Sequence, residues 1–505
     1  MGRHRDKRKN RAEERTSKAK VLDATPPYAG REVPVVRLDA SRVRIPKTGP
    51  MHVDGIVFAD DTLLPSVRDD KSLEQVANVA TLPGIVGPSM AMPDVHWGYG
   101  FPIGGVAAFD PARGGVVSPG GVGYDINCGV RLLASDLELG EIESRIEPLV
   151  DALFDAIPAG IGSTRREVIA SEEELDALLA DGLEWAHGAG LATDHDIERV
   201  EEHGRIRGAR PEAVGERART RGRPQLGTLG SGNHFAEVGV VDEVFDETKA
   251  QAFGLAKGRV TLMIHSGSRG LGHQVCTDFL GTMLRASSKY GVPLVDRQLA
   301  CAPIESREAE AYLGAMAAAA NFAFVNRQVM ATWAREVFAR LFDAALTTVY
   351  DVCHNIATWE EHVVDGKERC VLVHRKGATR ALPPGDRRLP RSLRDAGQPV
   401  IIPGDMGRYS FVLAGAPGSS ATFHSACHGA GRRLSRSAAQ RVFGRTDLEG
   451  NLRAQGILVR GASRATVVEE APLAYKDVAD VVGVVESAGL ATKVARLRPL
   501  GVIKG

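Results

Sequence analysis

Apolar runs rich in valine and isoleucine that lead directly into short, polar, glycine-containing segments recur from residue 94 to residue 504 of this chain. Residues 259–264 lead in this way into His265, and residues 400–402 lead into Pro-Gly-Asp405. Such runs predict buried strands. Helical patterns lie between them, at residues 141–157, 171–187 and 308–345. The alternation predicts one large, intertwined α/β domain, with the polar segments at the carboxyl ends of strands, where open α/β sheets bind ligands.

The charge of the chain is balanced overall but uneven along its length. The 505 residues include 63 Lys and Arg and 63 Asp and Glu. Residues 1–20 hold nine basic and three acidic residues, so their net charge is 9 − 3 = +6 and that of the remainder is about −6. This segment lacks the apolar core of a secretory signal. We expect residues 1–30 to form a basic, flexible tail, with contact to a polyanion as a second inference, and residues 31–505 to form the folded domain.

Cysteine usage and hydropathy predict a cytoplasmic protein that does not enter a membrane. The six cysteines are widely spaced and form no Cys-x-x-Cys motif. This spacing argues against a disulfide framework and favours a reducing compartment. The most apolar stretch, residues 313–325, contains Asn321 and is too short to cross a bilayer.

Side chains of the three kinds that transition metals prefer stand in the polar, glycine-containing segments. They are Asp125, Cys128, His234, His265 and His354. Five donors exceed the four of a closed structural zinc site, so they favour either two metals or one open catalytic metal. A thiolate can bridge two cations, and sulfur argues against a pure magnesium site and for manganese or zinc. Each donor alone could instead be an ordinary loop histidine or a buried cysteine.

His428 belongs to a second polar segment, His424-Ser-Ala-Cys-His-Gly-Ala-Gly, which precedes a helical pattern at residues 432–442. Backbone N–H groups at a helix start, with Arg432 and Arg433 beside them, form a cradle for phosphate. A histidine placed there can attack phosphorus and form a covalent N–P intermediate. A packing role at a helix N-terminus is the simpler alternative.

Two familiar signatures of nucleotide binding are missing from the chain. No Gly-x-x-x-x-Gly-Lys-Ser/Thr motif occurs, and Val363 stands where the Lys-x-Asp-Gly motif of nucleotidyl-lysine ligases needs its lysine. Residues 403–410, Pro-Gly-Asp-Met-Gly-Arg-Tyr-Ser, offer a replacement loop. Two arginine-rich stretches, residues 205–223 and 375–394, could follow a nucleic-acid backbone or be solvated loops. We expect the first of them to be an exposed loop rather than a core element.

Together these segments resemble the RtcB-type RNA-splicing ligases. The resemblance covers roughly residues 50–505 and rests on Met-Pro-Asp-Val-His-x-Gly-Tyr-Gly-Phe-Pro-Ile-Gly, Gly-x-Asp-Ile-x-Cys-Gly-Val-Arg, Gly-Ser-Gly-Asn-His-Phe, His-Ser-Gly-Ser-Arg-Gly-Leu-Gly-His, Cys-His-Asn, Cys-His-Gly-Ala-Gly-Arg and the closing Val-Ile-Lys-Gly. It implies an α/β catalytic domain over residues 31–505 with mixed sheets flanked by helices. It also implies an enzyme that joins RNA 3′-phosphate or 2′,3′-cyclic phosphate ends to 5′-hydroxyl ends, in tRNA splicing or RNA repair.

The resemblance further implies two Mn²⁺ ions, GTP, and a catalytic histidine, His428, that accepts GMP. Asp94 would lie near the incoming 5′-hydroxyl end. The implied ligands are Asp125, Cys128 and His234 for one ion and Cys128, His265 and His354 for the other. The residues implied to surround the guanylate are Asn233, His234, Phe235, Ala236, Glu237, His354, Asn355, Pro403, Gly404, Asp405, Met406, Ser410, His428, Gly429, Ala430, Gly431, Tyr475 and Lys504. RNA ends are the implied partner, with an archease-like activator as a further one.

Asp405 departs from the family pattern, in which a small hydroxyl residue occupies this place in the Pro-Gly-x-Met-Gly loop. An acid there would repel phosphate unless it is paired. Two other functions fit the same residues. A metal-dependent phosphoesterase or cyclic phosphodiesterase would use the metal ligands without needing His428 or Lys504, and a non-catalytic RNA-binding scaffold would keep only the fold.

Overall fold

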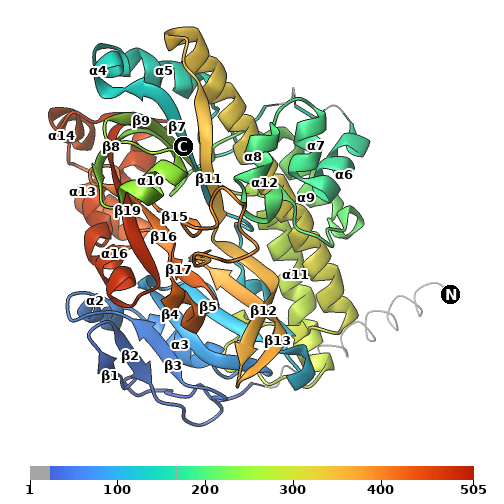
Figure 1. Cartoon of the computed structure of the whole chain (residues 1–505). Coiled ribbons are helices and arrows are strands. Elements are labelled where there is room, and N and C mark those ends of the chain that lie inside the picture. The colour runs from blue at the N-terminus through green and yellow to red at the C-terminus, as the bar shows by residue number, and fades with distance from the viewer. Residues whose placement is uncertain (1–22, 166–167, 170) are drawn as a thin grey trace.

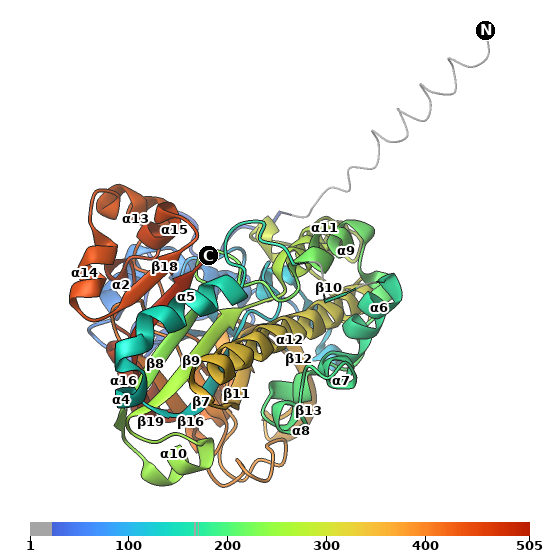
Figure 2. The same cartoon turned by 90° about the horizontal axis from the view of Figure 1, so that it is seen from above.

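Two large β-sheets with helices packed around them form the protein (Figure 1; Figure 2). The computed structural model describes residues 23–165, 168–169 and 171–505. The single α/β domain with mixed sheets and flanking helices is therefore confirmed. Within the described part of the chain, no helix combines the length and the apolar character needed to span a bilayer.

The predicted basic tail lies mostly outside the described residues, which begin at residue 23. Its last part, residues 23–30, packs against the domain, because Tyr28 is buried and its hydroxyl donates to the carbonyl of Pro46. A flexible tail therefore stays a prediction for residues 1–22 alone.

The first sheet has eight strands and carries most of the candidate metal ligands at one edge. Every pair in it is antiparallel except β18 with β19. Its strands, in spatial order, are β11 (Leu346–Cys353), β7 (Gly129–Glu138), β9 (Arg259–Ser266), β8 (Phe235–Val244), β19 (Ala491–Lys504), β16 (Ser410–Gly415) and β15 (Pro399–Ile402), with β18 (Leu458–Gly461) beside β19.

The second sheet has seven strands and carries Asp94, the buried carboxylate that contacts His428. Only β3 and β4 pair in parallel. Its order is β1 (Val36–Asp39), β2 (Arg42–Ile45), β3 (Gly55–Phe58), β4 (Ile85–His96), β5 (Ile103–Phe109), β13 (Lys367–Lys376) and β12 (Asn355–Val364). Two short pairs complete the strands, namely β6 (Val116–Val117) with β10 (Ala302–Pro303) and β14 (Ala378–Arg380) with β17 (Ser425–Cys427).

The long helix α12 (Arg307–Phe342), gold in Figure 2, confirms the pattern predicted at residues 308–345. Its C-terminal half packs on one face of the eight-stranded sheet with α5 (Ile146–Ala156), where Met330 and Phe338 join a core with Leu262 of β9. The other helices are α2 (Leu64–Asp69), α3 (Ser72–Val79), α4 (Leu139–Ile142), α6 (Glu172–Asp181), α7 (Leu183–Gly188), α8 (Asp194–Glu198), α9 (Glu216–Gly222), α10 (Glu247–Phe253), α11 (Arg269–Lys289), α13 (Arg436–Phe443), α14 (Leu448–Ala454), α15 (Arg464–Glu469) and α16 (Val478–Ser487).

Some boundaries differ from the prediction for local reasons. The pattern at residues 141–157 divides into α4, a 3₁₀ turn and α5, and that at 171–187 divides into α6 and α7. Gly182 separates the latter two with φ of 55°, a conformation that favours glycine. The polar segments are expected at the carboxyl ends of strands, but most strands here pair in antiparallel fashion. In such a sheet the start of one strand lies beside the end of the next, so the segments gather from both kinds of strand end.

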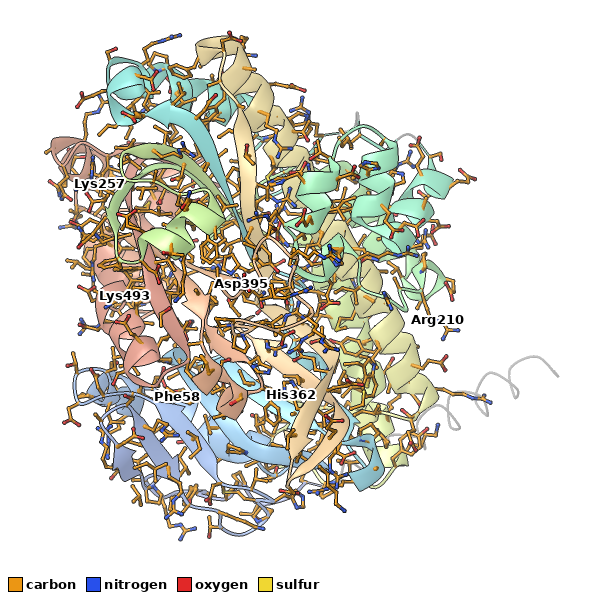
Figure 3. All side chains as sticks on the ribbon, viewed as in Figure 1. Phe58, Arg210, Lys257, His362, Asp395 and Lys493 are labelled. Carbon is orange, nitrogen blue, oxygen red and sulfur yellow. The ribbon has the colours of Figure 1, made fainter. Side chains whose placement is uncertain are left out.

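The arginine-rich stretch at residues 205–223 is not a simple exposed loop. It contains α9, whose Gly222 packs so closely on α11 that a Cβ would come within 2.5 Å of Leu271. Several of its arginines bind acids of the same chain, as Arg210 does at the surface with Glu310 at 2.6 Å (Figure 3). Its positive charge is therefore largely paired within the protein.

Candidate active site and metal centre

Antiparallel pairing around β9 gathers the predicted metal ligands at one edge of the eight-stranded sheet. His265 lies near the end of β9, opposite Phe235 at the start of β8. On the other side of β9, Ser266 lies opposite Gly129 at the start of β7. The residues just before these two strands, His234 and Cys128, therefore lie beside His265. His354 directly follows β11, which pairs with β7.

Two groups of donor atoms meet at Cys128. Within each group all ligand atoms lie within 4.8 Å of one another, and the groups are Asp125, Cys128 and His234, and Cys128, His265 and His354. The Cys128 Sγ lies 3.4 Å from His234 Nε2 and 3.2 Å from His265 Nε2. His234 Nε2 lies 2.7 Å from Asp125 Oδ2, and the Nε2 atoms of His265 and His354 are 3.3 Å apart.

The chemical state of these side chains suits divalent cations. Burial lowers the pKa of His265 and His354 well below the usual range, so both are neutral imidazoles with a free lone pair. Burial raises the pKa of the Cys128 thiol, and Asp125 raises it further. His234 donates from Nδ1 to the Leu229 carbonyl at 3.0 Å, which leaves Nε2 to face the group. The ligand atoms of the two groups are buried and crowded together, with too few hydrogens to pair all of their lone pairs. A cation bound among them would stabilise this arrangement.

Helix α12 holds the ligand-bearing loops from behind. The buried Arg327 donates from Nη1 to the carbonyls of Asn127 and Ser266, both at 2.9 Å. It also forms an ion pair with Asp351 on β11 at 2.8 Å. One side chain thus fixes the loop before Cys128 and the residue after His265. These contacts give the metal donors a rigid support.

His428 joins this centre from the short β14–β17 pair, because it directly follows β17. Its ring centroid lies 4.8 Å from that of His354. Its Nδ1 lies 2.5 Å from Oδ2 of Asp94, a carboxylate on β4 that is fully buried. The same oxygen accepts the backbone N–H of His428 at 3.0 Å and that of Gly429 at 3.2 Å. Asp94 therefore orients the imidazole through Nδ1 and leaves Nε2 available as a nucleophile.

The phosphate cradle predicted at a helix start after His428 is corrected by the structure. Helix α13 begins at Arg436, with the Ser435 hydroxyl accepting the N–H of Ala438, so residues 428–435 are not helical. The glycines there serve a close approach instead. A Cβ on Gly431 would come within 2.1 Å of the Asp94 carbonyl, and its φ is 74°.

A cavity of about 710 Å³ opens over the donor groups and His428. Its size matches that of small-molecule sites in proteins. The predicted nucleotide-contacting residues that line it are Asn233, Phe235, Glu237, His354, Asn355, Pro403, Gly404, Asp405, Met406, Ser410, His428, Gly429, Ala430, Gly431, Tyr475 and Lys504. His234 lies with the metal donors instead. Ala236 is buried in the core on the opposite face of β8, because successive residues of a strand face opposite ways.

Known proteins match almost the whole chain. The family model for tRNA-splicing ligase RtcB matches residues 75–505. This chain belongs to the RtcB family. The tRNA-splicing ligase RtcB of Thermococcus kodakarensis is 55% identical over 480 residues, which cover 94% of this chain and 99% of that protein. The RNA-splicing ligase RtcB of Mycobacterium tuberculosis is 52% identical over 432 residues, which cover 85% of this chain and all of that protein. As a member of the RtcB family, the protein is an RNA ligase.

In this RtcB protein the acid at position 405 is paired within its own loop. Asp405 Oδ2 lies 3.2 Å from Arg408 Nε, and Oδ1 accepts the N–H of Gly407 at 2.9 Å. Burial nevertheless raises its pKa to about 6. Burial and the nearby Asp405 raise the pKa of Glu237 to about 8, with Lys504 opposing the rise. Near neutral pH, this side of the cavity therefore carries less negative charge than its sequence indicates.

Sequence reasoning missed several residues that shape the RtcB site. Lys476 donates from Nζ to the carbonyls of Pro93 at 3.2 Å and Val95 at 2.6 Å, which flank Asp94. Glu470, on the cavity wall, accepts from Arg432 at 3.0 Å. A lysine or a glutamate outside a recognisable motif carries no signal of a site. The adjacency of Lys476 to the predicted Tyr475 is the only hint that the sequence offers.

Proposed function

We propose that this RtcB protein is a GTP- and Mn²⁺-dependent ligase that joins RNA 3′-phosphate or 2′,3′-cyclic phosphate ends to 5′-hydroxyl ends through a histidine–GMP intermediate. The observation that carries the proposal is the position of His428. Its imidazole stands beside two adjoining metal-donor groups, in a cavity of nucleotide size, with Asp94 on its Nδ1. A metal-dependent phosphoesterase would use the metal donors without needing His428.

The two donor groups would hold two Mn²⁺ ions, with Cys128 shared between them. The mixed oxygen, nitrogen and sulfur donors favour manganese over magnesium. When bound, the ions would offset the charge of the phosphates and polarise phosphorus. The protein's own part is to present neutral imidazoles, to keep the donor loops in place through Arg327, and to exclude bulk water by burial.

His428 would act as the nucleophile toward GTP. Its Nε2 attacks the α-phosphorus, an N–P bond forms, and the bond to pyrophosphate breaks. Asp94 stabilises the positive charge that develops on the imidazole. An oxygen of the RNA 3′-phosphate then takes the GMP and restores His428. Finally the 5′-hydroxyl oxygen attacks the activated 3′-phosphate, loses its proton, and GMP leaves. A cyclic end is first opened by water to the 3′-phosphate.

The remaining cavity residues would bind the guanylate. Glu237 and Lys504 offer an acceptor and a donor suited to the edge of guanine, and both are buried on the cavity wall. Asn233 and Ser410 offer neutral polar groups for the ribose and phosphate. The physiological RNA is proposed to be a tRNA cleaved during splicing or a damaged RNA. An archease-like activator is a further proposal, tested by measuring turnover with and without such a protein.

Labelling with GTP tests the proposal directly. The protein is incubated with Mn²⁺ and α-³²P-GTP, and we expect a protein–GMP adduct that is labile in acid and stable in base. The adduct should be lost in His428→Ala. His424→Ala is the matched control, because His424 belongs to the same segment but stacks near His362 outside the cavity lining. Hydrolysis of cyclic phosphate ends without any adduct would instead support a phosphodiesterase.

A further inference from the structure

Three aromatic side chains on the cavity wall have no part in the metal centre or the proposed guanylate site. They are Trp97, Tyr99 and Tyr124. Trp97 is 47% exposed, which is unusual for so large an apolar side chain in the wall of an active site. Tyr124 directly precedes the metal donor Asp125. We call these three residues the aromatic shelf.

The aromatic shelf is held firmly in place. The backbone N–H of Trp97 donates to Asp70 at 3.0 Å. The next residue, Gly98, donates its N–H to the buried Gln75 side chain at 3.0 Å and accepts from it at 2.6 Å. The ring of Tyr124 stacks on His273, with centroids 4.9 Å apart and an interplanar angle of 28°. Its edge contacts Tyr99, with centroids 5.5 Å apart. The backbone of Trp97 and the rings of Tyr124 and Tyr99 are thus held in place before any ligand arrives.

Positive charge accompanies the aromatic shelf. Lys71 Nζ lies 6.0 Å from the centroid of the Trp97 ring. Arg433 is exposed and lines the same cavity. Asp70, an acid that lines the same cavity, has its two oxygens occupied by backbone N–H groups of Ser72 and Trp97. Flat aromatic faces beside cations are the chemistry that binds single-stranded nucleic acid, because bases stack on the rings and phosphates meet the cations.

We propose that Trp97 and Tyr124 stack the bases of a single-stranded RNA end and lead that end to His428. The inference deepens the proposed function, which supplies RNA as the ligand. Trp97 follows Asp94 by three residues, Tyr124 adjoins Asp125, and both rings line the cavity that contains His428 and most of the metal donors. A base stacked on either ring would therefore lie in the same cavity as the reacting groups.

Direct RNA binding tests the proposal independently of ligase chemistry. Fluorescence anisotropy with the full chain measures the Kd of short single-stranded RNAs. Each RNA carries the fluorescent label at one end and either a 3′-phosphate or a 5′-hydroxyl at the other. Loss of one stacked base weakens binding by about 5- to 100-fold on the usual scale of such contacts. We therefore expect Trp97→Ala and Tyr124→Ala each to raise Kd by that amount for one of the two ends. Trp359→Ala is the matched control, because Trp359 is 49% exposed on β12 and does not line the cavity.

Abasic RNAs distinguish stacking from a merely structural role. Removing the terminal base should weaken binding to the wild-type protein but not to Trp97→Ala or Tyr124→Ala, and the end that shows this loss identifies which RNA end the shelf holds. Kd values within twofold of wild type in both variants, or equal losses with intact and abasic RNA, would overturn the proposal. Binding that depends on Trp97 in a protein that forms no GMP adduct would overturn the proposed function and leave the shelf intact.

Discussion

Replacing Asp94 with asparagine tests the proposed orientation of His428. The change keeps the size of a fully buried side chain and removes its charge. Oδ2 of Asp94 contacts Nδ1 of His428 at 2.5 Å and also accepts two backbone N–H groups. Burial raises the pKa of Asp94, but the charge and hydrogen bonds of His428 lower it by more, so the carboxyl is ionised at neutral pH.

The expected size of the effect follows from this geometry. An asparagine oxygen can still accept the two backbone N–H groups, so the loop should keep its shape. What is lost is the negative charge that faces the imidazole, and a hydrogen bond to a charged group is worth about 1.5–3 kcal/mol. If that energy is available only when His428 becomes positive, the rate of adduct formation falls by about 10- to 100-fold. An amide rotated to donate to Nδ1 would fix the proton on Nε2 and cause a larger loss.

The assay is the single-turnover rate of protein–GMP formation at saturating GTP and Mn²⁺. Asp110→Asn serves as the matched control, because Asp110 is also buried and paired, with Arg369 at 2.7 Å, but lies outside the cavity lining. Asp94→Asn that forms the adduct within twofold of the wild-type rate would refute the orienting role. A fall of equal size in Asp110→Asn would assign the loss to general destabilisation.

Three further changes test the metal centre, the cavity charge and the support from α12. Cys128→Ala removes the donor common to both groups, so mass spectrometry should find fewer than two bound metal ions per chain, and full occupancy would contradict a bridging thiolate. The pKa of Glu237 is about 8 in the folded protein, against an ordinary value of 4.5. Between these two pH values the folded state keeps a proton that the unfolded state releases, so the stability of the fold decreases as the pH rises from 4.5 to 8. Glu237→Gln should therefore lose less thermal stability than wild type between pH 6 and pH 9, and an unchanged difference would refute the burial of this charge. Arg327→Met breaks a fully buried ion pair, which costs about 3–5 kcal/mol of unfolding free energy. Arg68→Met removes the exposed pair with Glu32, which is worth less than about 1 kcal/mol, so denaturant titrations of equal midpoint for the two variants would contradict this difference.

Much of the fold and the donor set could be predicted from the sequence because both have local signals. Residues 308–345 show a helical period without proline, and β9 is a short apolar run that ends at a histidine. Residue type and neighbouring glycines indicate Asp125 and Cys128 as candidate metal ligands. Their convergence needed more than local signals, since it depends on the pairing of β9 with both β7 and β8.

What could not be predicted depends on contacts between distant residues. Lys476 reaches carbonyls more than 380 positions earlier in the chain, and no local pattern encodes that contact. The helix expected after His428 begins later, at Arg436, because Ser435 caps it there. The segment before the cap instead packs against the backbone of Asp94. Ala236 is predicted to contact the nucleotide together with its neighbours in β8. Side chains alternate between the two faces of a strand, so Ala236 faces the core instead.

The order of strands in the eight-stranded sheet has a consequence for biogenesis. The donors come from positions 125 to 354, and β19, the last strand of the chain, lies between β8 and β16. Because β19 ends at Lys504, the eight-stranded sheet cannot be completed before residue 504 has been synthesised, whereas the last donor, His354, is made 504 − 354 = 150 residues earlier. Assembly from such remote partners is slow. A cation that needs the donor groups as the completed sheet holds them would therefore bind only after β19 has paired.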